Sequence, residues 1–567
     1  MKKLILITLF SFVLCSCNDE FLEENPSGIF TAENLYTTST HFQSALNQLY
    51  SDYRGAFYIG SEEHCFGYQY GTDFGLNGQV RSVERFGNYV SQLDPTAGTA
   101  SWNWTRHYQM IAHANTILSR LEGSALDESE SVLVEAEAKF FRGAAYRALT
   151  YLYGGVPLVL EEVSGPKTDF VRNTKAECLA QIIADLEFSA ANLPDITEVA
   201  DGKVSSAAAN HLLAEVCISV GDFNKAVTAS SEVINNPGLA LMKSRFGSRK
   251  SEPGDVYWDL FRRDNQNRGA GNTEGVFVIQ WEIDVPGGGS LSTTRDGSYK
   301  AERVHPPLTR DIKRLDNASS KARFRWPVSD YTGGRGIGWL KPTYHFTHTI
   351  WMDDMGNLDL NDIRNSQYNL PRYYEYNNPN GSYPLGTIFD IDTNPEVVAS
   401  ITNTGDWPRS MYPYQTKVTT PGNHPEGIIN PANGLIYGTG GGTYTDWYDM
   451  RLAETYLIRA EAYLGLGQTD QAAQDINVVR DRANAVPIDA SDVDIDFILD
   501  ERLRELGIEE KRRLTLVRLG KLHERVVKYN PLNKDDIQPH HELFPIPRGE
   551  IEANIGAVLE QNPGYIN

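Results

Sequence analysis

Two segments far apart in the chain share one spacing of small and acidic residues, and this spacing constrains the fold more than any other feature. The matching positions are Ala214 and Ala460, Glu215 and Glu461, Gly221 and Gly467, and Ala226 and Ala472. Small residues let two antiparallel helices pack closely, and glycine suits the turn between them, as in tetratricopeptide-like repeats. One such pair leaves an apolar face uncovered, so several pairs have to stack. The sequence therefore predicts a mainly α fold on a tetratricopeptide-like helical-repeat frame.

Further segments have the apolar spacing of amphipathic helices that belong in such a stack. They cover residues 102–121, 133–153 and 178–193. The second of them runs into Gly154 and Gly155, which are residues that end helices. These segments extend the predicted stack toward the N-terminus.

A long irregular stretch separates the two similar segments. It is rich in glycine, proline, asparagine and aromatic residues, and its clearest expected strand covers 276–281. We therefore expect an N-terminal helical part at 31–240, a loop-rich insertion with short strands at 241–440, and a C-terminal helical part at 441–567. Loops on a rigid frame are where binding residues tend to lie.

The first residues have the pattern of an export signal. Lys2 and Lys3 precede an apolar run that ends at Leu14. This run is shorter than the about 20 apolar residues that a membrane-spanning helix needs. Residues 1–16 are therefore predicted to form a signal peptide that is removed from the mature chain.

A lipid anchor is expected directly after the signal peptide. Cys17 follows the small Ser16, as the modified cysteine of a bacterial lipobox does, whereas Cys15 follows the bulky Leu14. We predict lipidation of Cys17, with residues 17–30 as a polar tether that acyl chains hold to the membrane. A plain signal peptide with incidental cysteines is the alternative.

The charge of the chain argues against nucleic-acid partners. The chain has 52 Lys and Arg residues against 74 Asp and Glu residues, which gives a formal charge of −22. A protein this acidic repels phosphate backbones. We expect no nucleic-acid partner.

No motif of a catalytic, cofactor or metal site stands out. The chain has no G-x-S-x-G elbow, no H-E-x-x-H helix and no phosphate-binding loop. Its many acids give no distinctive carboxylate pair for glycoside hydrolysis. Cys65, Cys178 and Cys217 form no Cys-x-x-Cys pair, so we expect them to be buried and apolar. The sequence predicts a binding protein without enzyme activity, cofactor or metal.

Aromatic rings beside polar groups suggest a carbohydrate surface. Sugar C–H faces lie on aromatic rings, while Asp, Asn and Arg side chains hold the hydroxyls. Asp73 lies in an aromatic loop, and Trp102 and Asn103 stand together near the start of a helix. Trp281 ends the expected strand and Trp339 lies in a glycine-rich loop. We predict that these five residues contact the ligand.

The remaining tryptophans and two arginines divide between the core and a candidate ligand surface. Trp104 matches the helical pattern and is assigned to the core, and Arg81 and Arg85 are weaker candidates for hydroxyl contacts. Six of the nine tryptophans fall in the irregular insertion, where we expect a ligand surface more than a core: Trp258, Trp281, Trp326, Trp339, Trp351 and Trp407.

Motifs along nearly the whole chain resemble the SusD/RagB family of outer-membrane nutrient-binding lipoproteins. The matching segments are Cys17–Leu22, Trp104-x3-Tyr108, Glu135–Tyr146, Tyr153–Leu158, Arg451–Ala462, Glu501–Leu506, Phe544–Ile551 and Gln561–Tyr565. They stand in the family's order. One departure is that the family's tryptophan and aspartate are missing from residues 507–520, which we interpret as a variation in packing.

The resemblance implies a place and a partner. Family members lie on the outer face of the outer membrane, over a SusC-like TonB-dependent transporter. They capture oligosaccharides or other nutrients and deliver them to that transporter without breaking bonds. Two alternatives remain open from the residues alone: a helical-repeat scaffold that binds protein partners, and a surface hydrolase.

Overall fold

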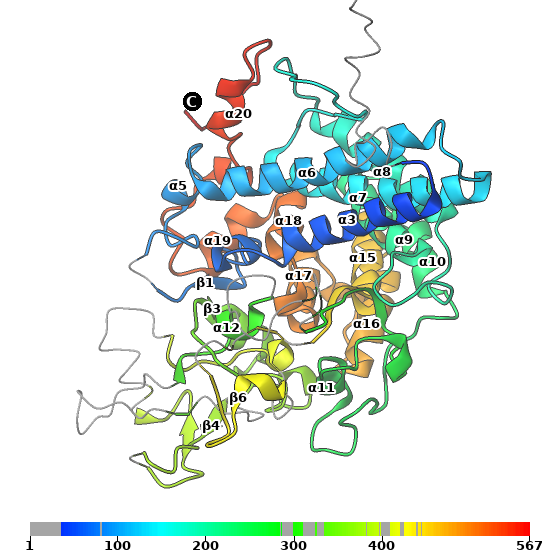
Figure 1. The fold of residues 1–567 in the computed structure, drawn as a ribbon. Coiled ribbons are helices and arrows are strands. Elements are labelled where there is room, and N and C mark those ends of the chain that lie inside the picture. The colour runs from blue at the N-terminus through cyan, green and yellow to red at the C-terminus, as the bar shows by residue number, and fades with distance from the viewer. Residues whose placement is uncertain are drawn as a thin grey trace, which may run out of the picture.

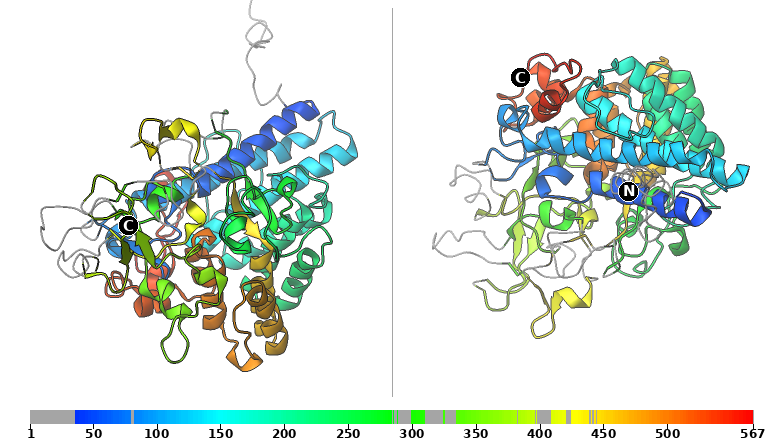
Figure 2. Two further views of the ribbon diagram at one scale, coloured as in Figure 1. Left: turned by 90° about the horizontal axis from the view of Figure 1, so that it is seen from below. Right: turned by 45° about the horizontal axis from the view of Figure 1, so that its top comes forward.

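The computed structural model has two parts, a stack of long helices and an irregular region beside it (Figure 1). The structure describes residues 36–79, 82–283, 285, 288, 299–309, 324–325, 334–381, 383–395, 397, 409–419, 424–437, 440, 442–443 and 445–566. The predicted signal peptide, Cys17 and the tether lie outside these residues. Both views of Figure 2 keep the helical stack on one side and the irregular region on the other.

Helices that follow one another in the chain pack side by side in the stack. Its elements before the insertion are α3 (Ser39–Phe57), α4 (Glu62–Cys65), β1 (Gly75–Asn77), α5 (Tyr89–Gln92), α6 (Gly98–Leu121), α7 (Glu128–Tyr153), α8 (Lys175–Asn192), α9 (Ser206–Ser219) and α10 (Phe223–Ile234). The helix starts are local in origin, because Asp127 with Glu130 and Thr174 with Glu177 form capping boxes at α7 and α8. Gly154 ends α7 with a φ of +75°, which favours glycine, so the helix ends where its sequence predicts.

The C-terminal part continues the same stack. Its elements are β8 (Trp447–Arg451), α15 (Leu452–Gly465), α16 (Thr469–Arg482), η8 (Ala490–Asp492), α17 (Ile495–Glu505), η9 (Gly507–Glu509), α18 (Arg512–Arg518), α19 (Leu522–Tyr529), η10 (Pro539–Glu542) and α20 (Arg548–Ala553), where η marks a 3-10 helix. Helix α10 packs directly against α15 although the insertion separates them in the chain. The predicted mainly α repeat frame is therefore confirmed.

The two similar segments adopt one structure. Gly221 lies between α9 and α10 and Gly467 between α15 and α16, with φ of +79° and +72°. Side chains rarely adopt this conformation, so the turn favours glycine. Ala226 and Ala472, at matching positions on the following helices, are fully buried. The shared spacing thus encodes a shared helix–turn–helix.

The glutamates of the two segments converge on one arginine. Glu215 and Glu461 are buried, and both face the Arg518 guanidinium, at 3.9 Å and 2.7 Å. Arg147 also binds Glu215, at 2.6 Å, and Arg502 lies 3.6 Å from Glu461. Helix α18 therefore connects the two repeats through buried charges.

The insertion is a set of short elements that returns to the frame at a two-stranded sheet. Strand β2 pairs antiparallel with β8, with Ile279 opposite Trp447, and β1 pairs with β3, with Leu76 opposite Lys341. The other pairs are β4 with β5 and β6 with β7. The elements are α11 (Val256–Leu260), η2 (Arg268–Ala270), β2 (Gly275–Ile279), α12 (Ala301–Val304), β3 (Leu340–Pro342), α13 (Tyr344–Thr347), η4 (Thr349–Trp351), η5 (Ile363–Asn365), β4 (Tyr373–Glu375), β5 (Ile388–Asp390), η6 (Thr416–Val418), η7 (Glu426–Ile428), β6 (Ile429–Asn430) and β7 (Leu435–Ile436).

Burial confirms some assignments and corrects another. Trp104 is buried as predicted, and Cys65, Cys178 and Cys217 are buried free thiols. Trp258 and Trp351 are also buried, so the expectation that the insertion tryptophans form a ligand surface is wrong for these two, while Trp326 and Trp407 lie outside the described residues. The insertion needs apolar anchors because it shares the main hydrophobic core with the helices. Among the described residues, no helix combines the length and apolarity that crossing a membrane requires.

Replacing the arginine between the two repeats tests this description. We expect Arg518→Met to lower the free energy of unfolding by about 3–5 kcal/mol, because it leaves two buried carboxylates without their shared partner. Arg548→Met is the control, since Arg548 is half-exposed in its ion pair with Glu552, and it should cost less than about 1 kcal/mol. Urea unfolding of both variants measures the difference. Equal costs would contradict the role of Arg518.

Candidate functional site

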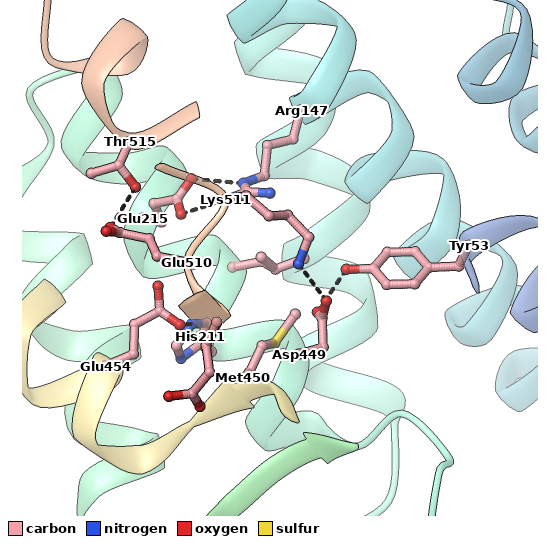
Figure 3. A pocket seen from close by; sticks show the side chains of 12 residues that line it. Tyr53, Arg147, His211, Glu215, Asp449, Met450, Glu454, Glu510, Lys511 and Thr515 are labelled. Atoms are coloured by element: carbon pink, nitrogen blue, oxygen red, sulfur yellow. Dashed lines mark hydrogen bonds and ion pairs between the residues drawn. The ribbon is translucent and has the colours of Figure 1, made fainter. Parts of the chain in front are cut away.

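A small polar pocket lies between the helical frame and the segment after α17 (Figure 3). Its volume is about 30 Å³, which holds water and excludes a sugar ring. Its lining residues are Tyr53, Arg147, His211, Leu212, Glu215, Asp449, Met450, Glu454, Glu509, Glu510, Lys511 and Thr515. Figure 3 shows their polar ends turned toward one another.

The charged groups around this cavity are paired. Asp449 accepts a hydrogen bond from the Tyr53 hydroxyl at 2.7 Å and forms an ion pair with Lys511 at 2.5 Å. Burial alone would raise the pKa of Glu215, but Arg147 and Arg518 lower the pKa to about 2. Glycoside hydrolysis needs a carboxylic acid with a raised pKa, so Glu215 does not fit that role. The cavity is a paired polar core, and within the described part of the chain no three His, Cys, Asp or Glu side chains are grouped to hold a metal ion.

A second arrangement, on the surface, involves Trp102, Trp281 and Trp339, which we call the tryptophan face. All three rings are partly exposed. An arginine guanidinium carbon lies within 5.3 Å of each ring centroid. The pairs are Arg106 over Trp102 at 4.4 Å, Arg54 over Trp281 at 5.1 Å, and Arg303 and Arg85 over Trp339 at 4.8 Å and 5.3 Å. Each unit combines an apolar ring with planar hydrogen-bond donors, which are the two parts that recognise a sugar.

One short segment, residues 58–66, contacts residues of or beside all three units. Gly60 lies so close to Trp102 that an added Cβ would be 3.0 Å from the ring, and its carbonyl accepts a hydrogen bond from Lys300 at 2.7 Å. Glu62 lies 3.9 Å from Arg303, which covers Trp339. The segment therefore contacts the neighbourhoods of all three rings.

His64 supports the first unit from the same segment. Its ring stacks on Trp102 with centroids 4.3 Å apart and planes 5° apart. Burial and the nearby Arg106 lower the pKa of His64, while Glu63 has the opposite effect. The net lowering of the pKa favours the neutral imidazole near pH 7. A neutral ring beside Arg106 avoids a second positive charge at Trp102.

A buried tyrosine lies beneath the face. Tyr299 is stacked parallel to Trp281 at 6.3 Å and contacts Tyr58 and Phe66 at 5.3 Å and 5.4 Å. The Trp281 backbone N–H donates to Asp446 at 2.6 Å. Aromatic packing and this hydrogen bond fix the position of the Trp281 ring.

The turn that carries Arg85 is strained. Arg85 and Phe86 have φ of +53° and +56°, a region that non-glycine residues rarely adopt. The Asn77 side chain donates to the carbonyls of Ser82 and Glu84 and so holds the turn. Strain of this kind persists only where surrounding contacts enforce it. Here it places Arg85 over Trp339.

Two predicted contacts lie in the core instead of the tryptophan face. Asp73 is fully buried, and its carboxylate binds Arg512 at 2.7 Å and Arg525 at 2.5 Å. Asn103 is buried, accepts a hydrogen bond from Tyr68 at 2.7 Å and donates to the Thr99 carbonyl. These partners occupy the groups that a ligand would need. Arg81 lies outside the described residues.

The structure adds residues that sequence reasoning missed: Arg54, Arg106, Arg303 and His64. Arg106 stands one helical turn after Trp102 in α6, so helical spacing alone could have indicated it. The other three reach the rings from distant segments, and no local pattern in the sequence marks them.

Comparison with known proteins agrees with this architecture. The family model described as "SusD family" matches residues 325–565, and the one described as "Starch-binding associating with outer membrane" matches residues 20–218. The chain is 24% identical to SusD-like protein P25 of Formosa agariphila, over 99% of both chains. The chain belongs to the SusD/RagB family.

Two further similarities span the SusD/RagB chain. SusD-like protein P2 of Formosa agariphila is 26% identical over the full length of both proteins. A solved structure named "Laminarin binding SusD-like protein" superposes with a TM-score of 0.67 at 22% identity, covering 94% of this chain and all of that one. The last similarity shows a shared fold.

Replacing Asp73 tests whether its carboxylate stabilises the core or contacts a ligand. Arg512 and Arg525 hold the pKa of Asp73 below its ordinary value in spite of burial. The stabilisation is therefore full above the unfolded pKa of about 3.9 and is lost as the pH falls further. We expect Asp73→Asn to lower the free energy of unfolding by about 3–5 kcal/mol at pH 7. The difference from the parent protein should shrink below about pH 4.

Urea unfolding across pH measures this effect. Asp481→Asn is the control, because Asp481 is largely exposed in its pair with Lys243, and it should cost less than about 1 kcal/mol. Asp73→Asn protein that is still folded should keep its affinity for any ligand of the tryptophan face. A stable variant with lost ligand affinity would restore Asp73 as a contact.

Proposed function

We propose that this SusD/RagB protein is a glycan-binding lipoprotein that captures oligosaccharides on the tryptophan face without cleaving them. The observation that supports the proposal is the grouping of three partly exposed indoles, each beside a guanidinium. Such units place an apolar indole and the hydrogen-bond donors of a guanidinium side by side, which are the parts that contact the C–H groups and the hydroxyls of a sugar. The description of one matching family model mentions starch binding and the name of one similar solved structure mentions laminarin binding, which points to the same class of ligand.

The proposal includes a place and a partner. We infer attachment to the outer membrane through lipid at Cys17, with the tryptophan face turned to the exterior. A SusC-like TonB-dependent transporter would receive the captured oligosaccharide. The family resemblance and the description of the matching family support this assignment. Copurification of the transporter with the full-length chain from membranes tests the partner.

Removing the rings tests the ligand surface. Among starch, laminarin and polygalacturonate, at least one polysaccharide should bind the purified chain in isothermal titration calorimetry. Trp102→Ala and Trp339→Ala should each weaken that binding at least tenfold, about 1.4 kcal/mol, because the sugar loses its contact with the indole and the arginine loses the ring that positions it. Trp102→Phe should retain more affinity than Trp102→Ala.

The matched control lies on the helical frame. Tyr463 is also partly exposed and has the Arg459 guanidinium 5.8 Å from its ring. Tyr463→Ala should leave the affinity unchanged. Absence of binding to every polysaccharide, or equal losses in Trp102→Ala and Tyr463→Ala, would contradict the proposal.

Neighbouring cysteines test the anchor. Cys17→Ala should abolish incorporation of labelled fatty acid and release the chain from the membrane fraction, because acyl chains supply the membrane affinity. Cys15→Ala should leave both unchanged. Labelling that persists in Cys17→Ala and disappears in Cys15→Ala would contradict the assignment.

A further inference from the structure

The most exposed tyrosine, tryptophan or phenylalanine of the described residues lies outside the tryptophan face. Tyr344, in α13, is 62% exposed, whereas the three indoles of the face are only partly exposed. Single exposed apolar residues are common on protein surfaces, so exposure alone assigns no role. Tyr344 differs from such residues because its surroundings fix the ring and place charged groups beside it.

An imidazole supports the Tyr344 ring on one side. The His348 ring lies parallel to it, with centroids 4.4 Å apart and planes 8° apart. His348 is itself buried, and its Nε2 lies 3.2 Å from Asp392 and its Nδ1 2.9 Å from the Thr347 hydroxyl. With 62% of Tyr344 exposed, the other side of its ring is accessible. A ring held in this way loses little conformational freedom when a ligand binds.

The hairpin of β4 and β5 carries charged groups next to Tyr344. Figure 1 shows β4 in the irregular region, away from the helical stack. The strands pair with Tyr373 opposite Asp390 and Glu375 opposite Ile388, and the pair between them is buried. Successive side chains of a strand point to opposite faces. Tyr373, Asp390, Glu375 and Ile388 therefore share the outer face of the hairpin.

The inner face of this hairpin is anchored in an aromatic cluster. The Phe389 and Tyr376 ring centroids lie 5.0 Å and 5.1 Å from that of Phe324. The Tyr374 hydroxyl donates to the Tyr412 carbonyl at 2.8 Å. These contacts fix the hairpin, so the groups on its outer face have defined positions.

Asp392 connects the hairpin with the Tyr344 ring. It stands two residues after Asp390, and its side chain is 52% exposed although it contacts His348. The hydrogen bond with His348 and the nearby Arg372 lower the pKa of Asp392, so its carboxylate is ionised at pH 7. A half-exposed carboxylate can accept hydrogen bonds from the hydroxyls of a sugar. We call the following four residues the tyrosine strip: Tyr344, Tyr373, Asp390 and Asp392.

Arg372 adds hydrogen-bond donors near Tyr344 and Asp392. Its Nη2 donates to Asn365 at 2.6 Å, while its Nε and Nη1 have no hydrogen-bond partner among the described residues. Burial lowers the pKa of Arg372 to about 10, against the opposing effects of Asp392 and Tyr344, so the guanidinium is charged at pH 7. Buried donors without partners are costly. A water molecule between Arg372 and a ligand hydroxyl would remove that cost.

The charges of the tyrosine strip suit a neutral ligand. One guanidinium, that of Arg372, stands near the carboxylates of Asp392, Asp390 and the neighbouring Glu375. Because the carboxylates outnumber the cation, an anionic polysaccharide would be repelled. A neutral sugar instead offers hydroxyls to the carboxylates and C–H groups to the tyrosine ring.

Tyr344 is close enough to Trp339 for one glycan chain to reach both. The two residues stand five positions apart, so their Cα atoms are separated by at most about 18 Å. We propose that the tyrosine strip is a second binding site for a neutral saccharide, which holds one part of a polysaccharide while the tryptophan face holds another. Two contacts with one chain raise the affinity through a high effective concentration. This inference rests on the proposed glycan-binding function and adds a second site.

Polysaccharides and their trisaccharides distinguish one site from two. The probes for isothermal titration calorimetry are soluble starch with maltotriose, and laminarin with laminaritriose. Tyr344→Ala should weaken binding of the polysaccharide at least about fivefold, because the second contact is lost. The matching trisaccharide, which fills the tryptophan face alone, should bind Tyr344→Ala as it binds the parent protein. Tyr344→Phe should retain most of the affinity, because its ring still stacks on His348.

The matched control is the other exposed tyrosine of the described residues. Tyr437 is 42% exposed and, within the part of the chain that the structure describes, no ring is stacked on it. Tyr437→Ala should bind polysaccharide and trisaccharide normally. Asp392→Ala should weaken the polysaccharide alone, as Tyr344→Ala does, because it removes both an acceptor and a contact of His348. Thermal unfolding should show that these variants remain folded, since the replaced side chains are exposed.

The outcomes separate this inference from the proposed function. Equal polysaccharide affinities of Tyr344→Ala and Tyr437→Ala would overturn the inference and leave the proposed function intact. Equal losses of polysaccharide and trisaccharide in Tyr344→Ala would also overturn it, because Tyr344 would then belong to the first site. Full polysaccharide affinity in Trp102→Ala and Trp339→Ala, together with a loss in Tyr344→Ala, would overturn the tryptophan face and keep the tyrosine strip. A parent protein that binds no glycan would overturn the proposed function itself and this inference with it.

Discussion

Buried arginine–carboxylate pairs hold distant parts of this chain in one structure. Asp73 from the N-terminal part lies between Arg512 and Arg525 of the C-terminal part, and all three side chains are removed from water. A buried charge that loses its partner costs several kcal/mol. The segment that carries Asp73 and the C-terminal helices must therefore lie side by side, and so must the elements attached to them.

The tryptophan face depends on that constraint. Asp73 lies two residues before the start of β1, whose partner β3 begins directly after Trp339. On the far side, Arg513 donates its backbone N–H to the Tyr68 carbonyl at 2.7 Å, close to the segment that contacts the rings. The C-terminal helices thus fix the base of a surface built from loops. Residues 507–520, where the family's tryptophan and aspartate are missing, supply the buried Arg512 and Arg513 to this base.

Sequence reasoning succeeded where the cause of a structure is local. Gly221, Gly467 and the matching alanines predicted a repeat because helix spacing and turn conformation act over a few residues. It failed for Asp73, because an acid among aromatic residues gives the same local pattern whether it faces a ligand or an arginine far along the chain. The prediction of exposure holds for Trp281 and Trp339, which are partly exposed, and is wrong for the buried Trp258. A tryptophan in an irregular segment can either anchor that segment in the core or face solvent.

Hydrogen–deuterium exchange locates the bound glycan without changing the protein. The full-length chain would be compared alone and with the polysaccharide that binds it tightest. Slower exchange of backbone amides in residues 58–66, 82–87 and 299–305, with α10, α15 and α16 unchanged, is the result expected for binding on the tryptophan face. Protection confined to the helical repeats would contradict it and place the ligand on the frame.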